Sequence, residues 1–345
     1  IVYVFSIDKT GLSCFSINNA NKLNQIANQF YKEIKTGGNY NHSVSLLSNM
    51  LLKPLSDKLQ MSSQITFIPD NILFQIPFEV LLNPNTGKML INSHTISYHY
   101  STYLWNKSMN KQVPKEQGIL AIAPVFENNQ NLTINANFRD RHFDDDYLYK
   151  ISSKDIPSLP FTGIETKEIV RLFKAKGFLN QLLISNEATK ENFLSQSNQY
   201  SILHIASHGY VSKTSPNNSG FFLYTIDENP SINKTIGFIN MSEVYSLKTN
   251  ADLVVLSSCN SGVGTVYEGE GLMALPRGFI FAGVPNVIAS LWKVHDEKTK
   301  DLMLLFYQHL LNGNSYAEAL RMAKLDCIAK GDLPINWSGF VIIGR

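Results

Sequence analysis

The alternation of short apolar segments with helical patterns from Gly118 onward constrains the fold of this chain most. The segments Ile119–Ala123, Tyr200–Ala206 and Ala251–Ser257 are almost continuously apolar, whereas a half-exposed strand would alternate apolar and polar residues. Strands that are apolar throughout are buried on both faces, as in a parallel sheet whose two faces are covered. The pattern therefore predicts an α/β fold with a mostly parallel sheet and helices on both faces.

The first part of the chain has a different pattern. Ile1–Ile7 and Gly11–Ile17 predict two short strands around a turn, and the apolar residues from Leu23 to Ile34 predict a helix. The polar segment Lys107–Gln117 contains three lysines and one proline, and it is the best internal boundary. The sequence therefore predicts a first half, residues 1–117, and a second half, residues 118–345.

Capping patterns predict two helix starts in the second half. Thr162 with Glu165 three residues later has the form of a capping box, and Asn186 is the expected cap of the next helix. The Asn- and Asp-rich stretch Glu127–Pro160 is expected to be a long loop, which in a compact domain is often functional.

Composition excludes several classes of protein. The net charge of +2 excludes a dedicated polybasic nucleic-acid binder, so no direct nucleic-acid partner is expected. No apolar run reaches the roughly 18 residues of a membrane helix, so no membrane partner is expected. The three cysteines have no metal-ligand spacing and indicate a reducing, cytoplasmic setting. Because residue 1 is Ile and not Met, we expect the chain to be a piece of a longer protein or a processed product.

Reactive side chains follow two of the predicted strands. His208 and Gly209 come after the first, and Cys259 comes after the second. Ligands bind beyond the carboxyl ends of strands in an open α/β sheet, so His208 and Cys259 are expected to meet there. An imidazole beside a thiol lowers the thiol pKa or takes its proton, so that sulfur can attack a carbonyl. The backbone amides of Gly209 and Cys259 are expected to stabilise the resulting oxyanion.

Longer motifs surround these side chains. His204 to Gly209 reads HIASHG, Leu256 to Gly262 reads LSSCNSG, and Cys259 follows His208 by 51 residues, about the spacing found in caspases. Through these motifs and those given below, the chain resembles the CHAT domains, prokaryotic relatives of caspases and separase, over nearly its whole length. The other motifs, in chain order, are IPDNIL (68–73), IPFEVL (76–81), GEGL (269–272), ASLW (289–292), FYQHL (306–310), ALR (319–321) and WSGF (337–340).

The resemblance implies a caspase-like fold, preceded by a family-specific α/β half that buttresses it. It implies that Cys259 is the nucleophile of a cysteine endopeptidase, that His208 is its acid and base, and that Gly209 donates to the oxyanion. It also implies a protein substrate, a role in regulated proteolysis or bacterial defence, and tetratricopeptide repeats or a regulatory protein as an upstream partner. No cofactor is expected.

Other interpretations remain beside this one. His204 and His208 have the spacing of a zinc motif, but that motif needs a helix and a Glu next to its first His, where this chain has Ile205. We therefore expect no metal, and we expect His204 to be a supporting, hydrogen-bonding residue. The rival functions are a catalytically silent interaction module, and acyl transfer or amide hydrolysis on a small molecule.

The resemblance to caspase-like folds also implies that two loops wall the pocket for the residue before the cut. One is Glu127–Pro160, and the other is Ser290–Glu297, which contains Trp292 and Asp296. Trp292 is either a subsite wall or plain core. A carboxylate in a pocket selects a cation, because leaving it unpaired is costly. Asp296 therefore predicts a preference for a basic or uncharged residue before the cut, and against aspartate.

Overall fold

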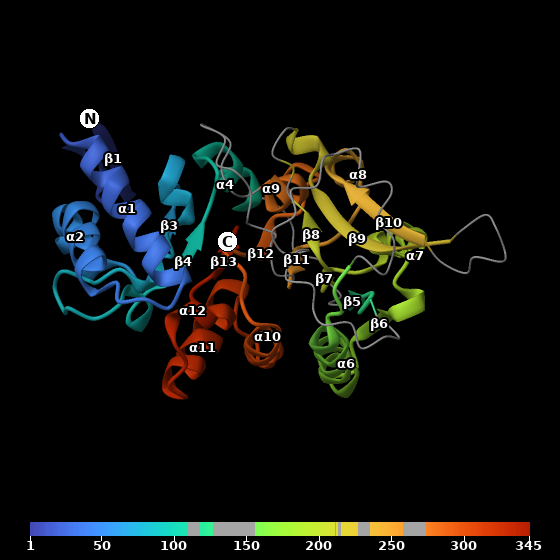
Figure 1. Cartoon of the computed structure of the whole chain (residues 1–345). Helices are drawn as coiled ribbons and strands as arrows, with labels where there is room; N and C mark the ends of the chain where they lie inside the picture. The colour runs from blue at the N-terminus through green and yellow to red at the C-terminus, as the bar shows by residue number, and fades with distance from the viewer. Residues whose placement is uncertain (110–117, 127–155, 211, 213–214, 227–234, 258–273) are drawn as a thin grey trace.

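An eight-stranded sheet forms the centre of the computed structural model, which describes residues 1–109, 118–126, 156–210, 212, 215–226, 235–257 and 274–345 (Figure 1). Neighbouring strands are parallel except at one place, where β13 is antiparallel to β12. The predicted α/β fold with a mostly parallel sheet is confirmed. In sheet order, the strands are β3 (Gln64–Phe67), β4 (Thr95–Tyr98), β13 (Phe340–Ile343), β12 (Asn286–Ser290), β11 (Leu253–Leu256), β7 (Ile202–Ile205), β5 (Gly118–Ala123) and β6 (Leu179–Ile184).

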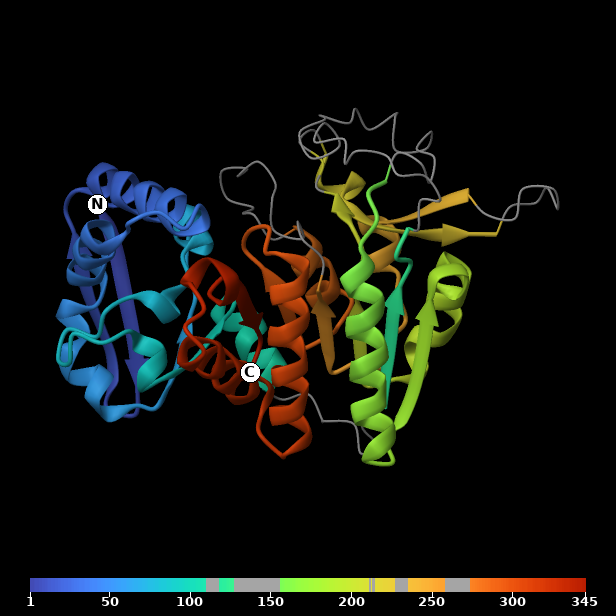
Figure 2. The same cartoon turned by 60° about the horizontal axis from the view of Figure 1, so that its bottom comes forward.

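Two smaller sheets complete the strands of the described residues. The predicted hairpin at the start of the chain is confirmed as β1 (Val2–Asp8) and β2 (Gly11–Ile17). A three-stranded antiparallel sheet consists of β8 (Gly209–Tyr210), β9 (Gly220–Thr225) and β10 (Thr235–Asn240). Figure 2 shows this sheet beyond the upper edge of the central sheet, where it follows directly from β7.

Helices cover both faces of the central sheet. In Figure 1, α6, α10 and α11 lie on one face, and α4 and α9 lie on the other. Figure 2 shows α6 and α10 side by side. The α-helices are α1 (Ala20–Lys35), α2 (Asn41–Leu51), α3 (Ser56–Met61), α4 (Thr102–Met109), α6 (Pro160–Ala175), α7 (Lys190–Gln196), α8 (Met241–Tyr245), α9 (Ala274–Phe281), α10 (Asp296–Leu311), α11 (Tyr316–Ala329) and α12 (Pro334–Trp337). Short 3-10 helices span Lys53–Leu55, Asn71–Gln75, Phe78–Val80, Leu90–Asn92, Ser185–Glu187, Ser197–Gln199 and Pro216–Asn218.

The two predicted helix caps are wrong. Helix α6 begins at Pro160, whose fixed φ suits the first helical position, so Thr162 lies inside the first turn and donates to the Leu159 carbonyl (2.6 Å). Glu165 consequently points into the core, where it is 1% exposed. The next helix is capped by Thr189 and not by Asn186, because the Thr189 side chain accepts from the Asn192 amide (3.1 Å).

The first half of the chain contributes to the central sheet. Strands β3 and β4 extend it beyond β13, and one apolar core runs from α1 through the sheet to α11. The expected boundary at residue 117 falls in 110–117, outside the described residues. The division into a buttressing and a catalytic half stays a prediction.

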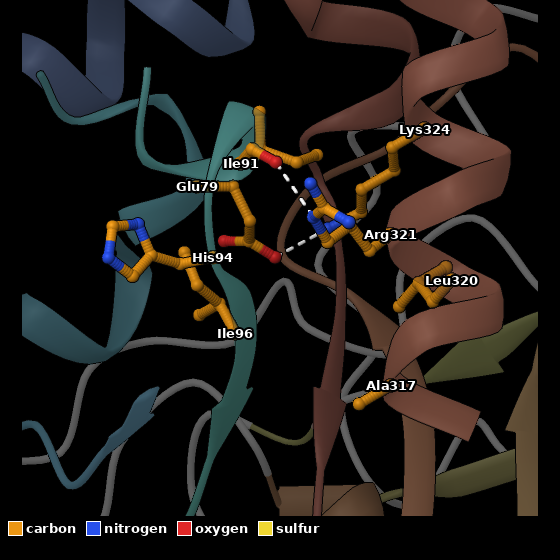
Figure 3. Close-up of a pocket in the computed structure, with 8 residues that line it drawn as sticks. All are labelled: Glu79, Ile91, His94, Ile96, Ala317, Leu320, Arg321 and Lys324. Atoms are coloured by element: carbon orange, nitrogen blue, oxygen red, sulfur yellow. Dashed lines mark hydrogen bonds and ion pairs between the residues drawn. The ribbon is translucent and has the colours of Figure 1, made fainter. Parts of the chain in front are cut away.

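A buried ion pair joins the first half to helix α11 (Figure 3). Lys324 Nζ lies 2.5 Å from Glu79 Oε1, and Tyr98 donates its hydroxyl to the other oxygen of that carboxyl group. Burial, and then the charge of Glu79, raise the pKa of Tyr98 well above its usual value, so the hydroxyl keeps its proton. One turn earlier, Arg321 Nε donates to the Ile91 carbonyl (2.8 Å). The charged side chains that line the small cavity in Figure 3 are therefore already paired with neighbouring groups.

Replacing Lys324 by Met is expected to lower the free energy of unfolding by about 3–5 kcal/mol, because it leaves a buried Glu79 without its cation. Adding Glu79→Gln should recover part of this loss. Urea unfolding of the single and double variants measures both effects.

The matched control is Lys58→Met, which removes the partner of Asp8 in a partly exposed pair. Water solvates the freed carboxylate there, so the change should be much smaller. Equal losses in Lys58→Met and Lys324→Met would contradict the prediction.

Candidate active site

Strands β5, β7 and β11 end side by side at one edge of the central sheet. Strand β7 lies between the other two and is parallel to both. Two backbone hydrogen bonds continue the pairing past the strand ends, from the Ala206 amide to the Ile122 carbonyl (2.9 Å) and from the Ser257 amide to the Ile205 carbonyl (3.0 Å). The segments that follow β7 and β11 therefore begin next to each other, as the sequence predicts.

His208 lies three residues beyond β7 and is half-buried. Its Nε2 is 2.9 Å from the backbone carbonyl oxygen of Pro157. A carbonyl oxygen can only accept, so the hydrogen of the neutral ring must be on Nε2. The lone pair is then on Nδ1, and Nδ1 is the nitrogen that can take a proton from a thiol.

A strained turn after β5 supports His208. Val125 and Phe126 both have positive φ angles, 61° and 53°, which costs on the order of 1–3 kcal/mol for each such residue. The turn places the buried Phe126 ring 5.9 Å from the His208 ring, centroid to centroid. Leu159, two residues after Pro157, donates its amide to the Val125 carbonyl (2.8 Å). In this turn, Phe126 packs near the imidazole ring of His208, and Val125 holds the segment that contains the Pro157 carbonyl.

Neither Phe126 nor Pro157 was identified from the sequence. Pro157 acts through its backbone carbonyl, which every residue type has, and Phe126 depends on a backbone conformation that bulky residues seldom adopt. The only available signal was the length of the stretch that includes Pro157.

Gly209 directs its amide away from the three-stranded sheet. Phe222 donates its amide to the His208 carbonyl (3.0 Å), so the adjacent pair, Gly209 and Phe221, is of the type without mutual hydrogen bonds. In such a pair the N–H groups point away from the partner strand. Because β8 is an edge strand, the Gly209 amide faces the side without a neighbouring strand in the described sheet.

Cys259 lies outside the described residues, which stop at Ser257 and resume at Ala274. The same holds for residues 127–155 of the first expected specificity loop. The structure therefore places the strand that leads to Cys259 beside the strand that leads to His208. The contact between the two side chains stays a prediction, as does the Cys259 amide as an oxyanion donor.

The expected substrate-binding residues follow β12, at the same edge of the sheet. Trp292 is 2% exposed, and its indole N–H donates to the Ile335 carbonyl (2.9 Å). Of the two roles left open for Trp292, this placement favours the core. Asp296 is half-buried in the first turn of α10, where a negative charge suits the helix dipole. Its role in specificity stays a prediction.

His204 is a buried, hydrogen-bonding residue, as the sequence predicts. Its Nδ1 is 3.0 Å from the Tyr307 hydroxyl, and its Nε2 is 2.9 Å from Glu165 Oε1. In the described part of the chain, no three His, Cys, Asp or Glu side chains gather where they could hold a metal ion. Within the same residues, no helix is both long enough and apolar enough to cross a membrane.

The model of one protein family, the CHAT domain, matches residues 42–345. The chain belongs to the CHAT domain family. The resemblance carried by the motifs around His208 and Cys259 is thereby confirmed, and the match begins at the second residue of helix α2.

Three solved structures match the fold of this chain at low sequence identity. The Arg-specific cysteine proteinase gingipain R has a TM-score of 0.51 and 10% identity, with 98% of this chain and 68% of that chain covered. The complex of Porphyromonas gingivalis RgpB pro- and mature domains gives a TM-score of 0.51 at 9% identity, covering 94% and 76%. The Saccharomyces cerevisiae separase–securin complex also matches, with a TM-score of 0.48, 14% identity and coverage of 81% and 15%. The caspase-like fold of the CHAT domain is confirmed.

Two curated relatives are tetratricopeptide repeat proteins. Tetratricopeptide repeat protein 28 of Mus musculus is 29% identical over 195 residues, and that of Homo sapiens is 28% identical over 193 residues. Each alignment covers 48% of this chain and spans only 8% of the relative's length.

The Pro157 contact predicts that neutral His208 in this CHAT domain carries its hydrogen on Nε2. Nitrogen-15 NMR of histidine-labelled protein distinguishes the two tautomers, and His208→Ala assigns the signal. We expect the Nε2–H form wherever the ring is neutral. A dominant Nδ1–H form would contradict the geometry.

Proposed function

We propose that this CHAT domain is a cysteine endopeptidase that hydrolyses peptide bonds in a protein substrate, with Cys259 as nucleophile and His208 as acid and base. The observation that supports it most is the contact between His208 Nε2 and the Pro157 carbonyl, since it leaves Nδ1 as the basic nitrogen. Cys259 follows Ser257 by two residues, so chain length alone limits the separation of their Cα atoms to about 7 Å. This reach supports a meeting of sulfur and imidazole at the shared strand edge.

In the proposed reaction, the Cys259 thiol transfers its proton to His208 Nδ1, and the sulfur attacks the carbonyl carbon of the scissile bond. The Gly209 and Cys259 amides stabilise the oxyanion of the tetrahedral intermediate. The imidazolium of His208 then protonates the departing amine, which leaves a thioester on Cys259. Water, deprotonated by His208, hydrolyses the thioester and restores the thiol.

For substrate selection we propose Asp296, with a basic or uncharged residue before the cut. Its position after β12 supports this, because β12 ends at the same edge as β11. A peptide library varied at the residue before the cut decides it, with wild type compared with Asp296→Ala. A strong preference for aspartate would refute the proposal, and an unchanged profile in Asp296→Ala would remove Asp296 as the cause.

The proposed setting is regulated proteolysis or bacterial defence in the cytoplasm, with an upstream tetratricopeptide repeat region or a regulatory protein as partner. The names of the curated relatives support the repeat partner. The same names support the alternative function, a catalytically silent interaction module, which would keep the fold without needing a reactive cysteine.

Cys259→Ala and His208→Ala are each expected to abolish proteolysis, with a loss of at least about a thousandfold, because removing either member disables the same step. The double variant should be little worse than either single variant. Mass-spectrometric mapping of new protein termini, in cells that contain wild type or a variant, measures the loss and identifies the substrate.

The matched control is Cys14→Ala, which removes an exposed cysteine on the hairpin. It should leave the set of cleaved termini unchanged. More than a few per cent of wild-type cleavage in Cys259→Ala would refute the assignment. A wild type that produces no new termini would favour the interaction module.

A further inference from the structure

Four polar side chains are buried together beneath the strand ends that lead to His208 and Cys259. They come from four elements or their immediate continuations, namely α6, β7, β11 and α10. None is more than 2% exposed. The four are Glu165, His204, Ser257 and Tyr307.

One carboxyl oxygen of this cluster contacts both strands. Glu165 Oε1 accepts a hydrogen bond from the Ser257 hydroxyl, directly after β11. The same oxygen lies 2.9 Å from Nε2 of His204 on β7, although off the direction of a well-aligned hydrogen bond. Tyr307 of α10 closes the cluster from the other side, with its hydroxyl 3.0 Å from His204 Nδ1.

The protons of the cluster have a consistent arrangement. Burial, and after it the charge of Glu165, raise the pKa of Tyr307 well above its usual value, so its hydroxyl keeps the proton. That hydroxyl can then donate to His204 Nδ1, which puts the ring hydrogen on Nε2, the nitrogen that lies 2.9 Å from Glu165 Oε1 without a well-aligned hydrogen bond. The Ser257 hydroxyl donates to the carboxyl oxygen, and this hydrogen bond offsets part of the cost of burying the carboxyl group.

The position of the cluster suggests more than packing. Ser257 is two residues before Cys259, and His204 is four residues before His208. A buried polar cluster is costly, and well-packed apolar side chains would stabilise this part of the core at least as well. A carboxyl group that touches both strands instead fixes how their ends lie relative to each other.

We propose that Glu165 is a positioning residue, which holds the ends of β7 and β11 in the register that brings the Cys259 thiol to the His208 imidazole. The inference rests on the proposed Cys259–His208 pair. It adds that the geometry of Cys259 and His208 depends on the carboxyl group of Glu165, which contacts neither residue in the described part of the structure.

Helix α6 links this carboxyl group to the other support of His208. The chain segment that enters the helix contains Pro157, whose carbonyl orients the imidazole. Gly163 in its first turns packs so closely on the strained turn that an added Cβ would lie 3.0 Å from Val125 Cγ2. The helix that carries Glu165 is therefore fixed against β5 as well, so a shift of Glu165 relative to the strands is resisted.

The test measures the reactivity of the Cys259 thiol, which needs no substrate. Wild type, Glu165→Gln and Ser257→Ala are treated with iodoacetamide across a range of pH, and labelling of each cysteine is followed by mass spectrometry of peptides. Exposed Cys14 serves as one internal reference. Cys327 serves as the slow reference, because burial raises the pKa of its thiol to about 11.

The matched control is Thr166→Val, next to Glu165 in the same helix. Thr166 is equally buried, but its hydroxyl donates only within α6, to the Thr162 carbonyl (2.8 Å). It tests whether any loosening of this helix changes the thiol. Thermal unfolding of all four proteins separates a loss of stability from a loss of position.

We expect wild-type Cys259 to react faster than Cys14 at neutral pH, and Glu165→Gln and Ser257→Ala to slow it on the order of tenfold, with the pH profile shifted towards an ordinary thiol. Thr166→Val should keep the wild-type profile. Should Glu165→Gln fail to fold, Ser257→Ala, which only removes a hydroxyl, decides alone.

Wild-type Cys259 could react fast while Glu165→Gln and Ser257→Ala keep the wild-type pH profile of labelling, even if their melting temperatures fall. That result would overturn the positioning role and leave the proposed peptidase intact. The same slowing in Thr166→Val would also overturn it. A wild-type Cys259 that reacts no faster than Cys14 would overturn the proposed function and this inference with it.

Discussion

Parallel backbone pairing of β5, β7 and β11 is the constraint on which the rest of the structure depends. Parallel strands end at the same edge, and the bonds made by the Ala206 and Ser257 amides carry the pairing one residue past the strands. The segments that lead to His208 and to Cys259 thus begin side by side, held by backbone hydrogen bonds that do not depend on the identity of those two side chains. The sheet can be this regular because its central strands are apolar on both faces and helices cover them.

The polar groups of the domain gather where the regular sheet alone cannot fix a geometry. Above the strand ends, a strained turn and the Pro157 carbonyl hold one face and one nitrogen of His208. Below them, the buried cluster of Glu165, His204, Ser257 and Tyr307 connects two strand ends and two helices. At the far end of the sheet, the pair of Glu79 and Lys324 joins the first half of the chain to α11. In each case a buried polar group links elements that are distant in sequence. Such a group specifies one arrangement of these elements, although apolar packing would stabilise the fold at least as well.

Residue patterns in the sequence predicted the central strands and the position of His208. They did not predict contacts that depend on backbone carbonyls or on unusual backbone angles. Strands such as β5 were found because a short continuous apolar run between turn residues is typical of a buried strand, and His208 was found because it comes shortly after such a strand. The expected cap at Thr162 was wrong because Pro160 starts the helix earlier, and this rotates Glu165 into the core. Pro157 and Phe126 had no signal, since one acts through its carbonyl and the other through an unusual φ.

The central claim is that His208 and Cys259 form one reactive unit at the shared strand edge. The ionisation of the Cys259 thiol, followed by the ultraviolet absorbance of the thiolate against a Cys259→Ser reference, tests it most directly. The account predicts a pKa well below the usual value of about 8.5 in wild type, and a return towards that value in His208→Ala. A thiol that titrates at the same pH with and without His208 would contradict it.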